Sequence, residues 1–302
     1  MIRTVLGDIA SATAGVVDSH DHLFLASPAL PGEALDDADA AQRELVAFQH
    51  RGGGTVVQWT PFGLHRDLAA LRRISASSGV HVVAATGRHR RALYPADAEV
   101  RALGVDRLAS VFITDIEERG CGLVKIGTGG ADLASDEADA LQAAAIAHRV
   151  TGAPIAIHLE GGSGADGVLH RLTAAGVPAR SIVLGHLGRN PDERRIVEAA
   201  ESGAWLCFDA PSARHPISVD RLARLLSVLT GAGHGAQLLL GADTTAASSR
   251  AAPFENGPAG LLRGTVEPLR VELGDSTLDA ILVGNSARAW ALDTDSATPA
   301  LR

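Results

Sequence analysis

The sequence predicts a single-domain α/β protein folded as a (β/α)8 TIM barrel over residues 1–302. Eight short apolar runs alternate with longer stretches rich in Ala, Leu and Arg almost from one end of the chain to the other. Continuous apolar runs are typical of strands buried on both faces of a parallel sheet, with helices covering that sheet. No low-complexity linker or internal repeat divides the chain, and barrels commonly form one unit of about 250 residues.

The expected strands are short runs made up largely of apolar residues, and the eight lie at 16–20, 55–59, 81–85, 123–126, 154–158, 181–184, 204–208 and 237–240. Helical patterns between them include 39–50, 67–77, 136–149, 164–175, 192–202 and 219–230. A last helix is expected over 278–292, with 291–302 fraying into a tail. The alternative fold is a doubly wound open sheet, but no G-x-G-x-x-G or P-loop sequence follows the first strand.

The composition is that of a folded protein with a sizeable core, because 46% of the residues are hydrophobic and 21% charged. The net charge of −8, without arginine runs interleaved with aromatics, argues against a nucleic-acid partner. No stretch of about 18 apolar residues occurs, so no membrane partner is expected. Cys121 and Cys207 are expected to be buried free thiols. We expect a cytoplasmic protein that acts on a small molecule, and consider a homodimer as its oligomeric form.

Lys125 is the only lysine in the chain, since 26 of the 27 Lys and Arg residues are Arg. It lies in an apolar run that ends in glycine and is typical of a short buried strand. Burial disfavours the charged form of an amine and lowers its pKa, which leaves a neutral, reactive group. The sequence therefore points to an amine used for chemistry, with a chance survivor of an Arg-rich composition as the alternative.

Metal-competent side chains come at the ends of several expected strands, where the carboxyl ends of barrel strands converge on one face. His20 and His22, two positions apart on an extended segment, point to the same side and can bind one metal together. Taken singly, such a histidine is explained as a core residue, and an aspartate as a helix cap. Their joint placement indicates a metal site whose candidates are His20, His22, Lys125, His158, His186 and Asp243.

Several segments in the same order resemble the phosphotriesterase-like family of the amidohydrolase superfamily. The resemblance covers essentially the whole chain and is carried by GVVDSHDHL at 15–23, KIG at 125–127, AIH at 156–158, LGH at 184–186 and GAD at 241–243. An opening RTVLG at 3–7 and a closing GNSARA at 284–289, which is similar to the family's final segment, extend the match.

The resemblance implies two divalent metal ions on the barrel. His20, His22 and Asp243 would hold the more buried ion, and His158 and His186 the more exposed one. Zinc is expected first, with Mn, Co or Fe as alternatives, because histidine and carboxylate sites accept all four. Lys125 would be N-carboxylated by CO2 and bridge both ions. A carbamate is an anion with two oxygens, whereas an ammonium would repel the ions and an arginine would stay protonated.

The resemblance also implies a hydrolase that uses a metal-bridging hydroxide, with Asp243 accepting its proton. We expect hydrolysis of a carboxylic ester, most specifically a lactone, with promiscuous phosphotriesterase activity. The alternatives are an amide or N-acyl amino acid hydrolase and a catalytically silent metal-binding barrel. Ala210 departs from both the arginine of acyl-homoserine lactonases and the histidine of phosphotriesterases, so that position selects neither subgroup.

The segment 86–91 is strongly basic and follows the third expected strand. Its arginines are expected to bind a carboxylate or phosphate on the substrate, with a solvated loop as the alternative. His89 stands where the family often has an aromatic pocket residue, and Trp59 ends the second strand. The expected substrate-binding residues are Trp59, Arg88, His89, Arg90 and Arg91.

Overall fold

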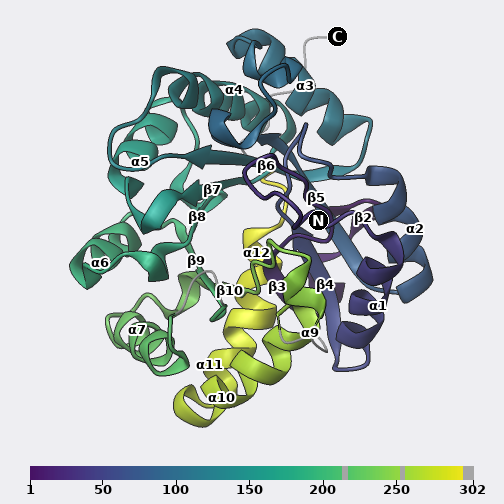
Figure 1. Cartoon of the computed structure of the whole chain (residues 1–302). Coiled ribbons are helices and arrows are strands. Elements are labelled where there is room, and N and C mark those ends of the chain that lie inside the picture. Colours follow the sequence, from purple (N-terminus) through teal and green to yellow (C-terminus); the bar gives the residue numbers. More distant parts are fainter. Residues whose placement is uncertain (213–216, 252–255, 295–302) are drawn as a thin grey trace.

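Eight parallel strands follow one another around the sheet in sequence order, from β3 to β10, and helices surround them (Figure 1). The computed structural model describes residues 1–212, 217–251 and 256–294. All eight expected strands are present, so the predicted (β/α)8 barrel is confirmed. The barrel strands are β3 (Val16–Asp21), β4 (Gly53–Gln58), β5 (His81–Arg88), β6 (Cys121–Thr128), β7 (Ile155–Leu159), β8 (Ile182–Gly185), β9 (Trp205–Asp209) and β10 (Leu238–Gly241).

Helices connect consecutive strands, and several begin at an Asp or Ser that accepts hydrogen bonds from the first free N–H groups. They are α1 (Ala38–Gln49), α2 (Leu68–Ser78), α3 (Val105–Glu117), α4 (Ser135–Thr151), α5 (Ala165–Ala174), α6 (Glu193–Glu201) and α7 (Val219–Gly231). After β10 come α8 (Ser248–Ala251), α9 (Pro258–Gly260), α10 (Glu267–Leu273), α11 (Asp275–Asp279) and α12 (Ser286–Ala289), with π-helical turns at Leu261–Val266 and Ala280–Asn285. Within the described ranges, no helix has the length and apolar character needed to cross a membrane.

The last strand returns to the first through two buried carboxylates. Residues 242–244, which follow β10, donate backbone N–H groups to β3 or to its side chains. The bonds run from Ala242 to the Asp18 carboxylate at 3.1 Å, from Thr244 to the Asp21 carboxylate at 2.7 Å, and from Asp243 to the His20 carbonyl at 2.8 Å. The closing seam of the barrel is therefore held partly by side chains.

The interior of the barrel is filled by apolar side chains up to one layer below the carboxyl ends of the strands. Trp59 and Trp290 meet edge to face with ring centroids 6.0 Å apart, and inward residues of other strands, such as Leu123 and Leu239, pack around them. This cluster leaves no room for a pore. Whatever site lies at the carboxyl ends therefore rests on a packed floor.

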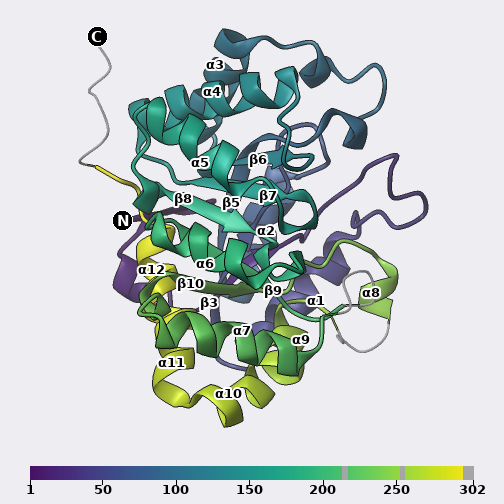
Figure 2. The same ribbon diagram turned by 90° about the vertical axis from the view of Figure 1, so that its left-hand side faces the viewer.

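The N-terminal hairpin, helix α3 and the segments from α8 to α10 were not assigned from the sequence. The hairpin of β1 (Ile2–Thr4) and β2 (Gly7–Ile9) covers the amino end of the barrel, where Ile2 joins the inner cluster. Figure 2 shows the N-terminus at one end of the barrel and α8 at the other. Helix α3 also lies outside the helices singled out above, because its pattern follows a long irregular connection.

The predicted helix over 278–292 is present as α11, the π-turn and α12. The predicted tail over 291–302 is wrong at its start, because Ala291 bridges Ile2 and Asp293 donates its N–H to the Gly152 carbonyl at 2.7 Å. These contacts tie 291–293 to the amino end of the barrel. Residues 295–302 lie outside the described residues.

A substitution at Gly241 tests how tightly the closing seam is packed, because a Cβ there would lie 2.5 Å from the His20 backbone nitrogen. We expect Gly241→Ala to lower the free energy of unfolding by about 1–3 kcal/mol, the usual cost of overpacking. Gly231→Ala is the matched control, since a Cβ at that helix end meets nothing within 4 Å. Urea unfolding of both variants measures the difference. Equal stabilities would show that the seam has room to relax.

Candidate metal centre

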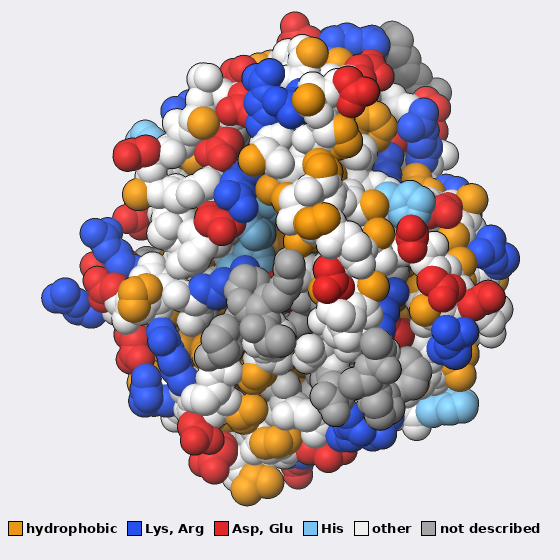
Figure 3. Space-filling model, in the orientation of Figure 1, with side chains coloured by type: hydrophobic (Ala, Val, Ile, Leu, Met, Phe, Trp, Pro, Cys, Tyr) orange, Lys and Arg blue, Asp and Glu red, His pale blue; other side chains and the backbone are white. Residues whose placement is uncertain are grey.

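The six metal-competent residues all lie at the carboxyl ends of barrel strands. Lys125 shares the inward face of β6 with Leu123, and His158 shares that of β7 with Ala156, because side chains alternate along a strand. Ring contacts and short distances join His20, His22, His158, His186 and Asp243, and Lys125 lines the same cavity as three of them. Figure 3 shows histidine side chains in a hollow near the middle of this face.

An irregularity in β3 sets the directions of the His20 and His22 side chains. The register between β3 and β4 shifts between Asp18 and Asp21, as in a bulge that redirects side chains. The His20 ring consequently stacks on the Trp59 indole, with centroids 3.7 Å apart and planes at 19°. The floor of the barrel thus orients the first of the candidate ligands.

A hydrogen-bond chain fixes which nitrogen of His22 carries the proton. The Thr60 hydroxyl donates to the Phe24 carbonyl at 2.5 Å, so it can only accept from His22 Nδ1, which lies 2.8 Å away. His22 Nε2 is therefore unprotonated in the neutral ring. It faces Asp243 Oδ1 at 3.5 Å, so two lone-pair atoms confront each other with no proton between them. A cation between these atoms would remove that repulsion.

Asp243 stands at the centre of the cluster. Its Oδ1 lies 3.3 Å from His20 Nε2, while its Oδ2 contacts the Arg189 guanidinium. Its backbone has a φ of +48°, a left-handed conformation that costs a non-glycine residue of the order of 1 kcal/mol. The hydrogen bonds of the closing seam offset that cost. Strain at this position indicates that the carboxylate is held where function requires it.

Asp209 and Arg189 belong to the site although the sequence analysis assigned them no role. Asp209 ends β9 and accepts from His186 Nδ1 at 2.7 Å and from Arg189 Nε at 2.9 Å. Since the carboxylate can only accept, His186 Nε2 is left bare, and it is buried without a partner among the described residues. An aspartate at a strand end, level with the other candidates, was the signal available in the sequence.

His158 lies on the more exposed side of the cluster. Its ring packs against those of His186 and His89, with centroids 4.3 and 4.5 Å away. His158 Nε2 lies 2.9 Å from Glu160 Oε2, which also pairs with Arg90 at 2.5 Å. His89 packs so closely over Gly127 that a Cβ there would lie 2.4 Å from His89 Nδ1, and only glycine fits.

Burial sets the protonation of these groups. It lowers the pKa of His22 to about 4 and those of His158 and His186 below their ordinary values. Burial also lowers the pKa of Lys125 to about 7, against the opposing pull of Asp243. Neutral imidazoles and a neutral amine therefore prevail slightly above pH 7. Those are the forms that bind metals and react with CO2.

The donor set fits a metal centre. Two groups each bring three ligand atoms within 4.8 Å of one another: His20, His22 and Asp243 form one, and His20, His186 and Asp209 the other. The first is the set that the family resemblance assigned to the more buried ion. His22 and His186 are buried, and each keeps one nitrogen bare. The arrangement accommodates cations and disfavours an empty, purely hydrogen-bonded state.

A cavity of about 330 Å³ opens above these ligands. Its polar side carries the candidate ligands His22, Lys125, His158 and Asp243 together with His89, Arg90, Glu160, Arg189 and Thr245. Its other wall is apolar and consists of Leu25, Ala29, Leu30, Pro61, Leu64, Ala92 and Leu93. The volume suits a small molecule with one reactive polar end and one apolar end.

Of the five residues expected to bind substrate, only His89 and Arg90 line this cavity. Arg88 is an outward residue of β5, beside Ile126, and its buried guanidinium pairs with Asp136 at 2.5 Å. Trp59 is fully buried beneath His20, and Arg91 is exposed in the following turn. The structure corrects these three assignments. Trp59 lies under His20, Arg91 does not line the cavity, and strand alternation sends Arg88 to the face opposite His89.

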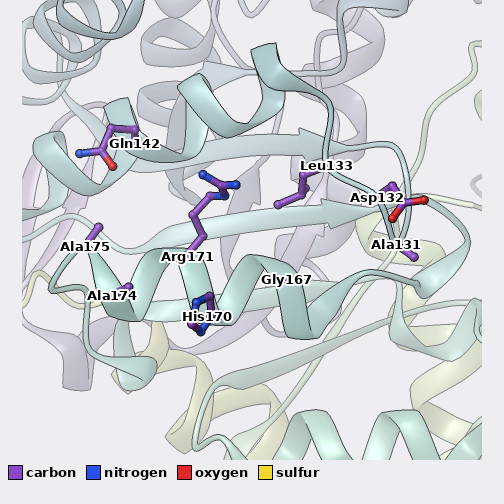
Figure 4. A pocket seen from close by; sticks show the side chains of 9 residues that line it. All are labelled: Ala131, Asp132, Leu133, Gln142, Gly167, His170, Arg171, Ala174 and Ala175. Atoms are coloured by element: carbon purple, nitrogen blue, oxygen red, sulfur yellow. The ribbon is translucent and has the colours of Figure 1, made fainter.

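A larger depression of about 740 Å³ lies outside the barrel between α4 and α5 (Figure 4). It is lined by exposed side chains such as Asp132, His170 and Arg171 and contains none of the metal-competent residues. Size alone would favour this depression, but chemistry and burial favour the smaller cavity at the strand ends.

Metal-competent side chains gathered at the carboxyl ends of an eight-stranded parallel barrel define the class of metal-dependent hydrolases. The sequence matches the phosphotriesterase family over residues 1–290, and the chain belongs to that family. The resemblance inferred from the motifs is thereby confirmed.

A phospho-furanose lactonase of Mycoplasmopsis agalactiae is 30% identical over 236 residues, which cover 70% of this chain and 66% of that protein. An N-acetyltaurine hydrolase of Rattus norvegicus is 33% identical over 181 residues, which cover 57% of this chain and 51% of that protein. This chain thus aligns with between half and two thirds of the length of these relatives. The crystal structure of a lactonase from Listeria monocytogenes matches with a TM-score of 0.89 at 24% identity, covering 97% of this chain and 99% of that one, and shows the same fold.

The lowered pKa of Lys125 has a consequence for stability that metal-free, CO2-free protein should reveal. Between pH 7 and 10.5 the unfolded chain holds the lysine proton and the native chain does not, so this residue makes stability rise with pH. We expect Lys125→Met to flatten that rise. Urea unfolding at intervals from pH 7 to pH 10 measures it. Parallel curves for the two proteins would show that Lys125 titrates normally.

Proposed function

We propose that this protein is a binuclear-metal-dependent lactonase. The observation that carries the proposal is the lone-pair confrontation of His22 Nε2 and Asp243 Oδ1 beside the neutral amine of Lys125. A bound cation would satisfy the first pair while His22 stays neutral. The only anion that a lysine supplies is its carbamate, which would balance two cations at once. A lactonase among the relatives supports the choice of reaction.

The proposed division of the ligands follows the family resemblance, and the geometry groups the first set. His20, His22 and Asp243 would hold one ion, and His158 and His186 the other, with the Lys125 carbamate between them. Zinc suits this set of nitrogen and oxygen donors best, and Mn, Co or Fe could replace it. When bound, two such ions supply a water with a pKa near 7 and polarise the carbonyl of the substrate.

Asp243 is proposed to move the proton. Burial alone would raise its pKa, but His20, His186 and Arg189 hold that pKa well below the ordinary value of a carboxyl group. Arg189 occupies Oδ2, so Oδ1 is the oxygen that faces His20 and His22. Asp243 would accept a proton from the attacking water and return it to the alkoxide released when the ring opens.

The cavity favours a lactone with an apolar substituent. Arg90 is paired with Glu160, and Arg189 with Asp209 and Asp243, so among the described residues both cavity arginines already have anionic partners. A phosphate on the substrate would have to displace one of these carboxylates from its arginine. The apolar wall, by contrast, is open to an alkyl or acyl chain, whose burial contributes about 0.8 kcal/mol per CH2.

Hydrolysis of an N-acyl amino acid or related amide is the second candidate. It is favoured by the N-acetyltaurine hydrolase among the relatives. The same proton transfer from Asp243 would release an amine in place of an alkoxide. Phosphotriester hydrolysis is proposed as a promiscuous activity of the same site.

A substrate panel tests this choice. Metal-loaded protein should show a kcat/KM for alkyl-substituted lactones at least about tenfold above those for aryl esters, phosphotriesters and N-acyl amino acids, a difference of about 1.4 kcal/mol. The same lactone ring bearing a phosphate should be poorer. A higher rate on the phosphorylated lactone would show that Arg90 or Arg189 binds the phosphate and that the apolar wall does not set the specificity. A higher rate on the amides would favour the second candidate.

Asp243→Asn keeps the size of the side chain and one ligating oxygen but removes the base. Loss of a general base typically costs 10²–10⁴-fold, so we expect kcat to fall by about that factor. Elemental analysis should still find metal in the purified variant. Full turnover by a metal-replete variant would assign the proton transfer to another residue.

A further inference from the structure

The side chain of Glu160 joins two parts of the cavity rim that come from different strands. It lies in the turn after β7, and its Oε2 is 2.9 Å from His158 Nε2. The same oxygen pairs at 2.5 Å with Arg90, which follows β5. Arg90 in turn donates its backbone N–H to His89 Nδ1 at 2.7 Å. The chain of contacts therefore runs from His158 through Glu160 to the part of the rim that follows β5.

The contact decides which nitrogen of His158 is available. Paired with Arg90, Glu160 is a carboxylate that can only accept, so the neutral His158 ring must carry its proton on Nε2. His158 Nδ1 is then bare, and it has no hydrogen-bond partner among the described residues. The ring also packs 4.3 Å from His186, whose own bare nitrogen is buried. The two bare nitrogens thus belong to adjacent rings.

We propose that Glu160, anchored by Arg90, is a positioning residue that fixes His158 as an Nδ1 ligand of the more exposed metal ion. The inference rests on the proposed function in taking His158 as a ligand. It assigns Arg90 a partner within the protein, in place of the substrate anion expected from the basic segment. A carboxylate that holds the second nitrogen of a ligating histidine fixes both its tautomer and its ring orientation.

Exposure makes this support necessary. His22 and His186 are clamped by buried partners, Thr60 and Asp209, within the barrel. His158 lies at the rim, where its side chain is 14% exposed and its partner Glu160 is 46% exposed. Without a second partner, an exposed carboxylate would readily replace its hydrogen bond to the histidine with hydrogen bonds to water. The ion pair with Arg90 restrains it, so the two residues act as one unit.

Measuring the metal affinity of the apo-protein tests the proposal without relying on turnover. Stepwise titration of apo-protein with Zn²⁺ against a chelating indicator, in the presence of bicarbonate, should give two equivalents for the parent chain. Glu160→Ala should weaken one equivalent by about 10–100-fold, the usual cost of losing such a support, and leave the other unchanged. Glu160→Gln keeps an oxygen that can accept from His158 and should stay near the parent value. Arg90→Ala should fall between them.

Asp166→Ala is the matched control, because it also removes an exposed carboxylate paired with an arginine, at 3.1 Å, but on α5 away from the cavity. It should bind both equivalents normally. Nitrogen-15 NMR of the metal-free protein adds an independent readout. The His158 ring, assigned with a His158→Gln variant, should show the Nε2-protonated tautomer in the parent chain and a mixture in Glu160→Ala.

Two results would overturn the proposal. Parent-like affinity for both equivalents in Glu160→Ala would show that His158 needs no support. Equal, severe loss in Glu160→Ala and Glu160→Gln would show that Glu160 acts through its charge or as a ligand itself. Failure of the parent chain to bind any metal is a different result, because it would contradict the proposed function as a whole.

Discussion

The site depends on how the last strand of the barrel is joined to the first. Asp18 and Asp21 accept N–H groups from Ala242 and Thr244, and Asp243 lies between these two bonds. The residue is thereby forced into a left-handed backbone conformation that places its carboxylate against His20 and His22. Without this seam, Asp243 after the last strand would not meet His20 and His22 on the first. The same few hydrogen bonds therefore close the barrel and bring the candidate ligands together.

Around that seam the site is layered. The Trp59 indole supports His20 from below, buried carboxylate and hydroxyl partners fix the tautomers of His186 and His22, and the exposed rim carries a more adjustable set of ion pairs. Rigidity therefore decreases from the barrel floor to the cavity mouth. This gradient places the metal-competent residues deep in the structure and the cavity walls on loops that can change without disturbing the strands.

The sequence was sufficient for the barrel and for placing the six metal-competent residues at its strand ends, because strand periodicity and strand ends are local signals. It was insufficient for Asp209 and Arg189, whose importance comes only from the neighbours that folding gives them. Arg88 was misplaced for a definite reason. The basic segment continues β5 by several residues beyond the expected strand end, so alternation turned Arg88 towards α4 and away from the cavity.

The stack of Trp59 on His20 gives the protein a built-in optical reporter. Its indole lies 3.7 Å from the ring of a candidate ligand, whereas Trp290 lies beneath it and Trp205 on another strand. Any change in the electronic state of His20 acts first on the emission of this one fluorophore. Occupancy of the centre can thus be followed in the intact protein, in real time and without a label, by light that the barrel itself emits.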